Sequence, residues 1–444
     1  MFHNGILFGN AFGTPEMRAL FEESSFVERF MAAEAALARA QADVGIIPRD
    51  AAERISETAS LEYLDLDAVE RTIAEIDLFT VAIIETWKDA IGPAGEYIHY
   101  GATSQDIADT AMVLLVRDGL ELIDAELATI RDALADLAIE HAETPMMGRT
   151  HHVHALPITF GMKVADWYDE LTRGIDRLEA ATRRLQVVEC FGAVGSLASL
   201  GEDGLEVQER FAAELGLDVP NTAWFASRDR FLELLNAFAA LGGTLSRIAR
   251  QVLLLNREEI AELSEPIPDG AIGSSTMPHK RNPVKSQRTV GLAVLLRGHA
   301  SMMASLVEQY DERDAGLWYA EYAIVPSAFL YLHRSLRNVS LTIEGLEVHP
   351  DSMERNMHIH GGLVTSEAVM MALSDAMGRI TAHEVVHEAA QEALETDRSF
   401  EEILLEDDHI REALSPDELA ALTDPTEYTG VADRIARRTV DSDR

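Results

Sequence analysis

The chain of 444 residues has few cysteines and lacks any long apolar segment. Cys190 is the only cysteine, so no disulfide can form within the chain and a small secreted scaffold held by disulfides is excluded. No run approaches the roughly 18 apolar residues of a membrane span. The first ten residues lack the basic and apolar regions of a secretory signal. These absences predict a cytoplasmic protein that makes no contact with a membrane.

Positive charge is also scarce. The sequence has 37 Lys and Arg against 76 Asp and Glu, a formal net charge of −39 at pH 7, and only Lys88, Lys163, Lys280 and Lys285 are lysines. A polyanion would be repelled by such a chain in nearly every orientation, so no nucleic-acid partner is expected. In molar salt the Debye length is about 3 Å and this self-repulsion is largely screened. The composition therefore predicts a halophilic protein, with an acidic mesophilic enzyme as the alternative.

Prolines are sparse, and the gaps between them are long enough for extended helices. Between Pro220 and Pro266 a single helical stripe recurs at steps of three and four residues. Its members are Phe231, Leu234, Leu235, Phe238, Leu241, Leu245, Ile248, Val252 and Leu255. The stripe predicts a helix from near Asp229 to near Leu263, and residues 106–141, 158–188, 286–308 and 322–342 show similar patterns. Strand-like alternation is hard to find, so the predicted fold class is all-α with an elongated central bundle.

Breaks in these patterns suggest three domains. Residues 1–105 read as an N-terminal domain of shorter helices, 106–346 as the long-helix domain, and 347–444 as a C-terminal domain of short polar helices.

Acidic residues are missing from three polar or basic windows, at 97–105, 144–165 and 270–307. In so acidic a chain, such windows suggest a site for an anionic small molecule that is assembled from distant segments. Within the third window, residues 270–283 combine two glycines, two prolines and two serines. This composition predicts a long loop of the kind that covers an active site, against the alternative of a solvated basic turn.

The run GSSTMPHKRNP at 273–283 resembles the signature loop of the fumarase/aspartase superfamily. HYGATSQDIADT at 99–110 and MGRTHHVHALPITFG at 147–161 are similar to the first and second conserved regions of that superfamily, in the same order. The resemblance covers nearly the whole chain. It implies the three-domain fumarase/aspartase fold and a homotetramer with a central twenty-helix bundle. It further implies active sites shared by three subunits and a small anionic carboxylate as substrate.

The resemblance also implies catalytic roles for particular residues. Ser274 would be the base that removes a proton from the carbon next to a carboxylate. Lys280 and Asn282 would hold the carboxylate oxygens that gain charge. His151 would be the general acid that protonates a leaving nitrogen or oxygen.

The remaining site residues that the resemblance implies would bind substrate: Thr103, Ser104, Thr150, Arg313 and His99. For His99, packing and indirect support of the site are equally open alternatives. A metal site at His151, His152 and His154 is the competing reading of the second block, but the spacing is poor and the chemistry of the superfamily needs no metal. We therefore expect neither a metal nor a cofactor, and a structural role for His358 and His360.

Two branches of the superfamily share the signature loop. The second block, with His151 and His154, is similar to adenylosuccinate lyases. Glu312-Arg313-Asp314 is followed instead by AGLWYAEY, which resembles the 3-carboxy-cis,cis-muconate cycloisomerases, and puts Trp318, Tyr319 and Tyr322 where adenylosuccinate lyases hold a phosphate with serines and an arginine.

A second absence points to the same branch. The additional active-site histidine of adenylosuccinate lyases has no counterpart in residues 73–77. Ser227 departs from the glutamine that is usual in both branches. We therefore predict a 3-carboxy-cis,cis-muconate cycloisomerase, with adenylosuccinate lyase as the alternative and an inactive structural homologue as a third possibility.

Overall fold

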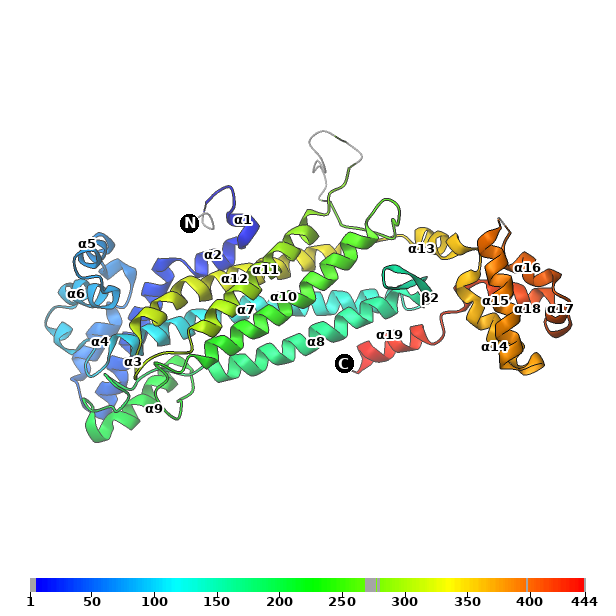
Figure 1. The fold of residues 1–444 in the computed structure, drawn as a ribbon. Helices are drawn as coiled ribbons and strands as arrows, with labels where there is room; N and C mark the ends of the chain where they lie inside the picture. Colours follow the sequence, from blue (N-terminus) through cyan, green and yellow to red (C-terminus); the bar gives the residue numbers. More distant parts are fainter. Residues whose placement is uncertain (1–4, 268–276, 278–279, 397, 443–444) are drawn as a thin grey trace. The chain divides into compact units, whose positions relative to one another are not determined.

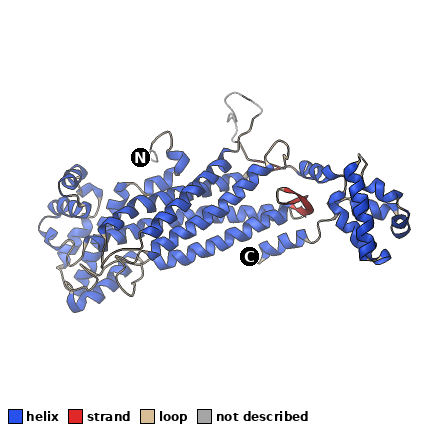
Figure 2. Cartoon of the chain, in the orientation of Figure 1, coloured by secondary structure: helices blue, strands red, loops and turns tan. Residues whose placement is uncertain are grey.

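The computed structural model describes residues 5–267, 277, 280–396 and 398–442. Helices dominate, and strands are short (Figure 1 and Figure 2). The helices are α1 (Gly9–Phe12), α2 (Pro15–Leu20), α3 (Glu23–Val44), α4 (Arg49–Glu57), α5 (Leu66–Ile76), α6 (Phe79–Ile91), α7 (Ser104–Glu140), α8 (Phe160–Leu185), α9 (Gly204–Leu215), α10 (Asp229–Leu255), α11 (Val284–Ser305), α12 (Ala315–Glu344), α13 (Pro350–Met357), α14 (Ser366–Met377), α15 (Arg379–Glu395), α16 (Phe400–Glu406), α17 (Asp408–Ala413), α18 (Pro416–Thr423) and α19 (Ala432–Asp441). The strands are β1 (Pro145–Thr150), β2 (Val153–Thr159), β3 (Leu263–Ser264) and β4 (Glu347–Val348), paired β1 with β2 and β3 with β4. The all-α prediction is confirmed.

The predicted helices match α7, α8 and α11 within a few residues at both ends, whereas α12 begins at Ala315 instead of near residue 322 and α10 ends early. All nine members of the predicted stripe are buried. The helix stops at Leu255, short of the predicted end near Leu263. Past that point Ala261 takes a left-handed φ of 51°, and Asn256 Oδ1 accepts a hydrogen bond from the backbone N–H of Glu265 at 3.1 Å. The asparagine side chain thereby stabilises a turn where the apolar repeat has ended.

Contacts divide the chain into two compact units, each made of three segments. Unit 1 comprises Met1–Leu127, Gly174–Leu245 and Arg288–Arg337, and unit 2 comprises Ala128–Arg173, Ser246–Gln287 and Asn338–Arg444. Helices α7, α8, α10, α11 and α12 contribute residues to both. The division into three consecutive domains at residues 105 and 346 stays a prediction.

Within unit 1 the long helices pack closely because glycines face large side chains. A Cβ at Gly119 would lie 2.8 Å from the Phe329 ring, and one at Gly174 would lie 2.5 Å from Leu241. These contacts join α7 to α12 and α8 to α10, so that unit 1 is a helical bundle with an apolar interior.

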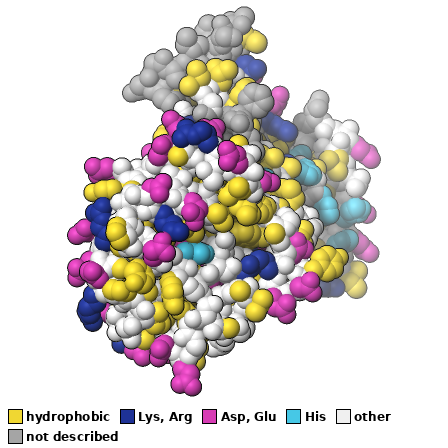
Figure 3. All heavy atoms as spheres, turned by 90° about the vertical axis from the view of Figure 1, so that its left-hand side faces the viewer, with side chains coloured by type: hydrophobic (Ala, Val, Ile, Leu, Met, Phe, Trp, Pro, Cys, Tyr) yellow, Lys and Arg dark blue, Asp and Glu magenta, His cyan; other side chains and the backbone are white. Residues whose placement is uncertain are grey.

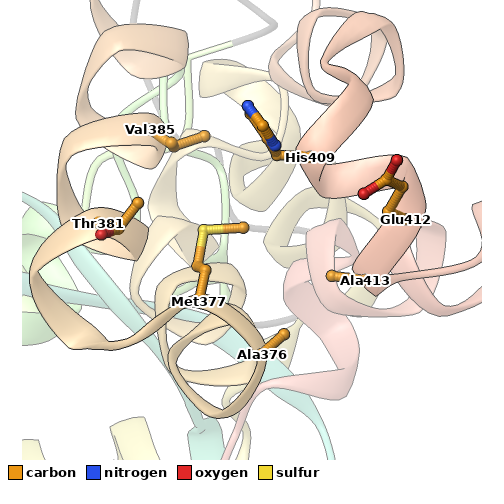
Figure 4. A pocket seen from close by; sticks show the side chains of 7 residues that line it. All are labelled: Ala376, Met377, Thr381, Val385, His409, Glu412 and Ala413. Atoms are coloured by element: carbon orange, nitrogen blue, oxygen red, sulfur yellow. The ribbon is translucent and has the colours of Figure 1, made fainter.

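In unit 2 the C-terminal helices α14–α18 share a compact apolar core. Capping boxes begin α16, at Ser399 and Glu402, and α18, at Ser415 and Glu418. A pocket of about 360 Å³ lies among these helices, and Figure 4 shows His409 of α17 across from Val385 of α15. The residues that line it are Ala376, Met377, Thr381, Val385, His409, Glu412 and Ala413. None of these seven is a predicted site residue.

The surface carries the charge that the composition predicts. In the space-filling view of Figure 3, acidic side chains are scattered over the visible face, with Lys and Arg side chains among them. Across the described ranges, no helix is both long and apolar enough to cross a membrane.

Candidate active site

The first predicted block forms a tight turn in unit 1, just before α7. His99 and Gly101 both take left-handed backbone angles, with φ of 58° and 72°. A residue other than glycine adopts such an angle only where its surroundings hold it there. Here Glu34 on α3 accepts hydrogen bonds from the backbone N–H of His99 at 3.2 Å and from its ring Nδ1 at 2.6 Å. The turn therefore presents His99 in one fixed orientation.

Asp106 connects this turn to a second loop of unit 1. Its carboxylate accepts hydrogen bonds from the backbone N–H groups of Thr103, Phe191 and Gly192, at 2.8, 2.7 and 3.0 Å. Burial raises the pKa of Asp106 to about 6, although these N–H donors and the charge of His99 act in the opposite direction. The predicted binding residue Thr103 is therefore held beside the loop that follows Cys190.

Two further predicted binding residues also lie in unit 1. The Ser104 hydroxyl accepts a hydrogen bond from the Thr80 hydroxyl at 2.8 Å. Arg313 donates from Nη2 to the Ala193 carbonyl at 3.0 Å, and its guanidinium carbon lies 4.9 Å from the centre of the Phe225 ring. Its Nε is buried and has no hydrogen-bond partner among the described residues. Arg313 is thus held against Ala193 and Phe225 with one buried donor unsatisfied.

A small pocket of about 180 Å³ opens in unit 1 next to Arg313 and Phe225. Its walls are apolar groups, hydroxyl groups and one carboxylate: Val194, Gly195, Thr222, Ala223, Phe225, Ala226, Ser227 and Glu312. Ser227, the residue that departs from both branches, is part of this lining. Among the lining residues that the structure describes, Glu312 is the charged one, and its carboxylate disfavours a doubly charged anion.

A buried ion cluster supports the start of α12. Arg228 is 1% exposed and donates to Asp109 at 2.7 and 3.0 Å and to Glu321 at 2.8 and 2.5 Å. The indole N–H of Trp318 also donates to Asp109, at 2.9 Å. Trp318 is therefore a core residue that fixes the helix, and of the three aromatic residues singled out in the sequence Tyr319 is the exposed one.

Glu189 is a further buried carboxyl group of unit 1 that the sequence did not single out. It accepts a hydrogen bond from the backbone N–H of Trp224 at 3.0 Å. Burial, together with the charges of Asp109 and Asp106, raises its pKa to about 10. The raised pKa favours the neutral acid form of Glu189 near pH 7.

The second predicted block forms the β1–β2 hairpin of unit 2, which the sequence did not predict. Thr150 pairs with Val153, so the connection is the two-residue turn His151-His152. Both histidines have positive φ, 52° and 67°, as a type I′ turn requires, although Asn-Gly is the usual sequence there. Thr150, His151 and His152 are exposed. The predicted acid therefore sits at the tip of a strained hairpin.

Beside the turn of the hairpin, Arg149 forms an ion pair with a buried carboxylate. Arg149 donates to both oxygens of Glu262, at 2.9 and 2.6 Å, and Glu262 is 0% exposed. Asn356 Nδ2 donates to the same carboxylate at 2.8 Å. His154 lies against His360, with ring centres 5.4 Å apart, and burial lowers the pKa of His154, followed by the charges of Arg149 and His360. The packing of His360 against His154 agrees with the structural role expected for His360.

No group of three or more His, Cys, Asp or Glu side chains that could hold a metal ion occurs in the part of the chain that the structure describes.

Ser274, the predicted base, lies outside the described residues, and the structure describes the signature loop only at its edges. Lys280 is exposed and Asn282 is half-buried. Glu265, which precedes the loop, accepts hydrogen bonds from the backbone N–H groups of Lys285 and Ser286, which follow it, at 2.9 and 2.8 Å. Glu265 thus caps the first turn of α11, where a negative charge is favourable.

The predicted site residues fall into two groups. His99, Thr103, Ser104 and Arg313 belong to unit 1, where Asp106 and the loop after Cys190 bring Thr103 and Arg313 to one region. Thr150, His151, Lys280 and Asn282 belong to unit 2. Sequence reasoning missed the carboxylates that position both groups, Glu34, Asp106 and Glu262.

Comparison with known proteins agrees with this fold and these blocks. A family model described as Lyase matches residues 11–298, and one described as Adenylosuccinate lyase C-terminus matches residues 362–439. The chain therefore belongs to the fumarase/aspartase superfamily of lyases.

Relatives within that superfamily have several activities. The chain is 38% identical to the N-acetyl-S-(2-succino)cysteine lyase of Dickeya dadantii over 96% of this chain and 94% of that protein. It is 39% identical to the adenylosuccinate lyase of Methanocaldococcus jannaschii over 96% and 93%. Among solved structures, the 3-carboxy-cis,cis-muconate lactonizing enzyme of Pseudomonas putida has a TM-score of 0.93 and 36% identity, with 98% of each chain covered.

Proposed function

We propose that this chain is a 3-carboxy-cis,cis-muconate cycloisomerase, a lyase-type enzyme that works on a tricarboxylate without a phosphate group. The pocket beside Arg313 carries this assignment. Its lining of small apolar and hydroxyl groups contains Glu312, and no cationic side chain is among the lining residues that the structure describes. A carboxylate there repels a phosphate dianion, so the pocket suits a neutral part of a substrate better than a nucleotide phosphate.

The proposed chemistry is an elimination, or the addition that reverses it. In the elimination direction Ser274 takes the proton from the carbon next to a carboxylate, and the electron pair moves onto the carboxylate oxygens. Lys280 and Asn282 stabilise that charge, with Thr103, Ser104, Thr150, Arg313 and His99 as further binding groups. The bond from the β-carbon to oxygen then breaks, and the leaving carboxylate needs no proton.

Adenylosuccinate lyase is the second candidate, and the second block favours it. A leaving nitrogen must be protonated, and His151 is exposed at a turn where it can reach a substrate. A succinylated cysteine is a third substrate to compare. Its leaving thiolate needs protonation less than a leaving nitrogen does, and it carries no phosphate for the pocket to bind.

We further propose that the enzyme is a homotetramer in which three subunits build each active site. The exposed face of α11 supports this proposal. Gly291, Val294 and Gly298 follow one another along it at helical spacing, and a Cβ added at either glycine would meet no other atom within 4 Å. Small residues along one face let helices of other copies approach closely. Gly298→Glu should yield a smaller species in light scattering, and an unchanged tetramer mass would contradict the proposed interface.

The charge balance supports a halophilic enzyme, and we propose that it works in the cytoplasm. At −39 net charge, adding KCl should raise the melting temperature steeply until the charges are screened. A melting temperature that is the same in 0.1 M and 2 M KCl would contradict this part of the proposal.

The decisive assay offers 3-carboxy-cis,cis-muconate, adenylosuccinate and N-acetyl-S-(2-succino)cysteine separately to the enzyme in molar KCl. We expect the largest kcat/KM for carboxymuconate. Its turnover is measured as the loss of the ultraviolet absorbance of its conjugated diene. Ser274→Ala should abolish turnover of every substrate that is accepted, with helix content retained. A preference for adenylosuccinate would replace the first candidate with the second, and full activity of Ser274→Ala would contradict the assigned base.

A further inference from the structure

Glu34 has no role in the mechanism above, yet it is a carboxylate in an apolar setting. It lies in α3 among Ala33, Ala35 and Ala36, and it is 1% exposed. Both of its oxygens contact His99, one the ring Nδ1 at 2.6 Å and the other the backbone N–H at 3.2 Å. Burying a carboxylate is costly unless hydrogen bonds compensate. The hydrogen bonds that compensate the buried Glu34 carboxylate both come from His99, which is a predicted substrate-binding residue.

The double contact fixes both the backbone and the ring of His99. The backbone contact supports the left-handed φ of 58°, and the ring contact makes Nδ1 the donor to a carboxylate. The opposite nitrogen, Nε2, has no hydrogen-bond partner among the described residues, and the side chain keeps 19% of its surface exposed. Nε2 is thus the atom of this ring that is left for a ligand.

We propose that Glu34 is a positioning residue for the active site, which orients His99 and keeps it protonated so that Nε2–H can donate to a substrate carboxylate. The proposal rests on the assignment of His99 as a binding residue in the proposed function. It adds a residue from α3, far from the three conserved blocks, to the machinery of the site.

The electrostatic surroundings favour the same state. The charged groups that face His99 are Glu34 from α3 and Asp106 from the first turn of α7. Burial lowers the pKa of His99, but the charge and hydrogen bond of Glu34, with the charge of Asp106, raise it above its ordinary value. Because a raised pKa keeps the imidazolium at higher pH, binding through Nε2–H should be lost as the pH rises through that value.

Diethyl pyrocarbonate tests the protonation state of His99 without any substrate, since a histidine reacts with it only as the neutral imidazole. We would follow modification of the His99 peptide by mass spectrometry across pH 5 to 9 in the full-length enzyme. Wild type should show a midpoint above that of the exposed His152. Glu34→Gln, which keeps the shape but removes the charge, should lower the midpoint by about one pH unit or more. Glu28→Gln, an exposed carboxylate of the same helix, should leave it unchanged.

Several outcomes overturn the proposal: an equal midpoint in wild type and Glu34→Gln, a midpoint no higher than that of His152, or a His99 that stays unmodified at every pH. Kinetics then separate this proposal from the proposed function. Glu34→Gln should raise KM for the accepted carboxylate about tenfold or more, leave kcat nearly unchanged, and move the alkaline limb of kcat/KM to lower pH. Glu34→Asp should recover part of the loss. A shifted midpoint with unchanged KM would show that Glu34 controls His99 while His99 lies outside the substrate site.

Discussion

The turn at residues 98–104 and the hairpin tip at 151–152 both hold histidines in the left-handed backbone region, but their surroundings differ. His99 is fixed at its backbone and its ring by one buried carboxylate. His151 and His152 are exposed, and their side chains have no hydrogen-bond partner within the described ranges. A binding group gains from being fixed in advance. The side chain of an acid at an exposed turn is not fixed in this way, so His99 is positioned before a ligand binds and His151 is not.

Removing the interior support of unit 1 should have the largest effect. Arg228→Ala would leave Asp109 and Glu321 buried without their cation, which typically costs about 3–5 kcal/mol. We expect that loss in the free energy of unfolding, measured with urea at fixed ionic strength. Arg210→Ala, at an exposed pair on α9, should change it by no more than about 0.5 kcal/mol. Similar losses in the two variants would show that the cluster is not what stabilises unit 1.

At the hairpin tip, the effect should appear in catalysis and not in folding. His151→Ala should slow a substrate with a nitrogen leaving group by about 10²–10⁴-fold in kcat, because that step needs a proton. It should slow a substrate with a carboxylate leaving group much less. His152→Ala is the matched control and should keep most of the activity. Equal losses on the two substrate types would remove the acid role from His151.

The pH dependence of stability tests the turn in unit 1, because Asp106 should contribute part of it. The pKa of Asp106 is raised to about 6 in the folded chain, so the folded state binds this proton more tightly than the unfolded state. The stabilisation is complete below about pH 4 and is lost as the pH rises through 6, by at most about 3 kcal/mol. Asp106→Asn should reduce the slope of unfolding free energy between pH 4 and 6, while the slope of the same sign that comes from the raised pKa of Glu189 remains. Asp132→Asn, at an exposed position of α7, should preserve it, and an unchanged slope in Asp106→Asn would place the titration elsewhere.

The sequence could predict what repeats locally or matches a long motif. The stripe from Phe231 to Leu255 predicted α10 because each member lies on one helical face, and the three blocks located His99, His151 and the signature loop. The end of α10 was wrong because it depends on Asn256 and Glu265, whose contact appears only after the chain has turned.

The positioning carboxylates could not be predicted for a related reason. Glu34 and His99 are 65 residues apart, and one more acidic residue is inconspicuous among 76. One local signal was present, since a charge among Ala33, Ala35 and Ala36 interrupts an otherwise apolar stretch of α3. The hairpin was missed because β1 and β2 carry no regular apolar alternation, and Gly148 permits a bulge between them. A Cβ there would lie 2.6 Å from the Leu156 carbonyl.

The smallest expected effect comes from replacing the two turn histidines with glycine, which distinguishes backbone strain at the hairpin tip from a functional role of the side chains. A type I′ turn favours glycine at its second position, so His152→Gly should relieve the left-handed strain and stabilise the hairpin by about 0.5–1 kcal/mol. Slower amide hydrogen exchange in β1 and β2, with activity retained, would show it. His151→Gly relieves a similar strain but should lose the acid. If both variants exchanged faster than wild type, the histidines would be stabilising the turn, and their backbone angles would no longer indicate a functional constraint.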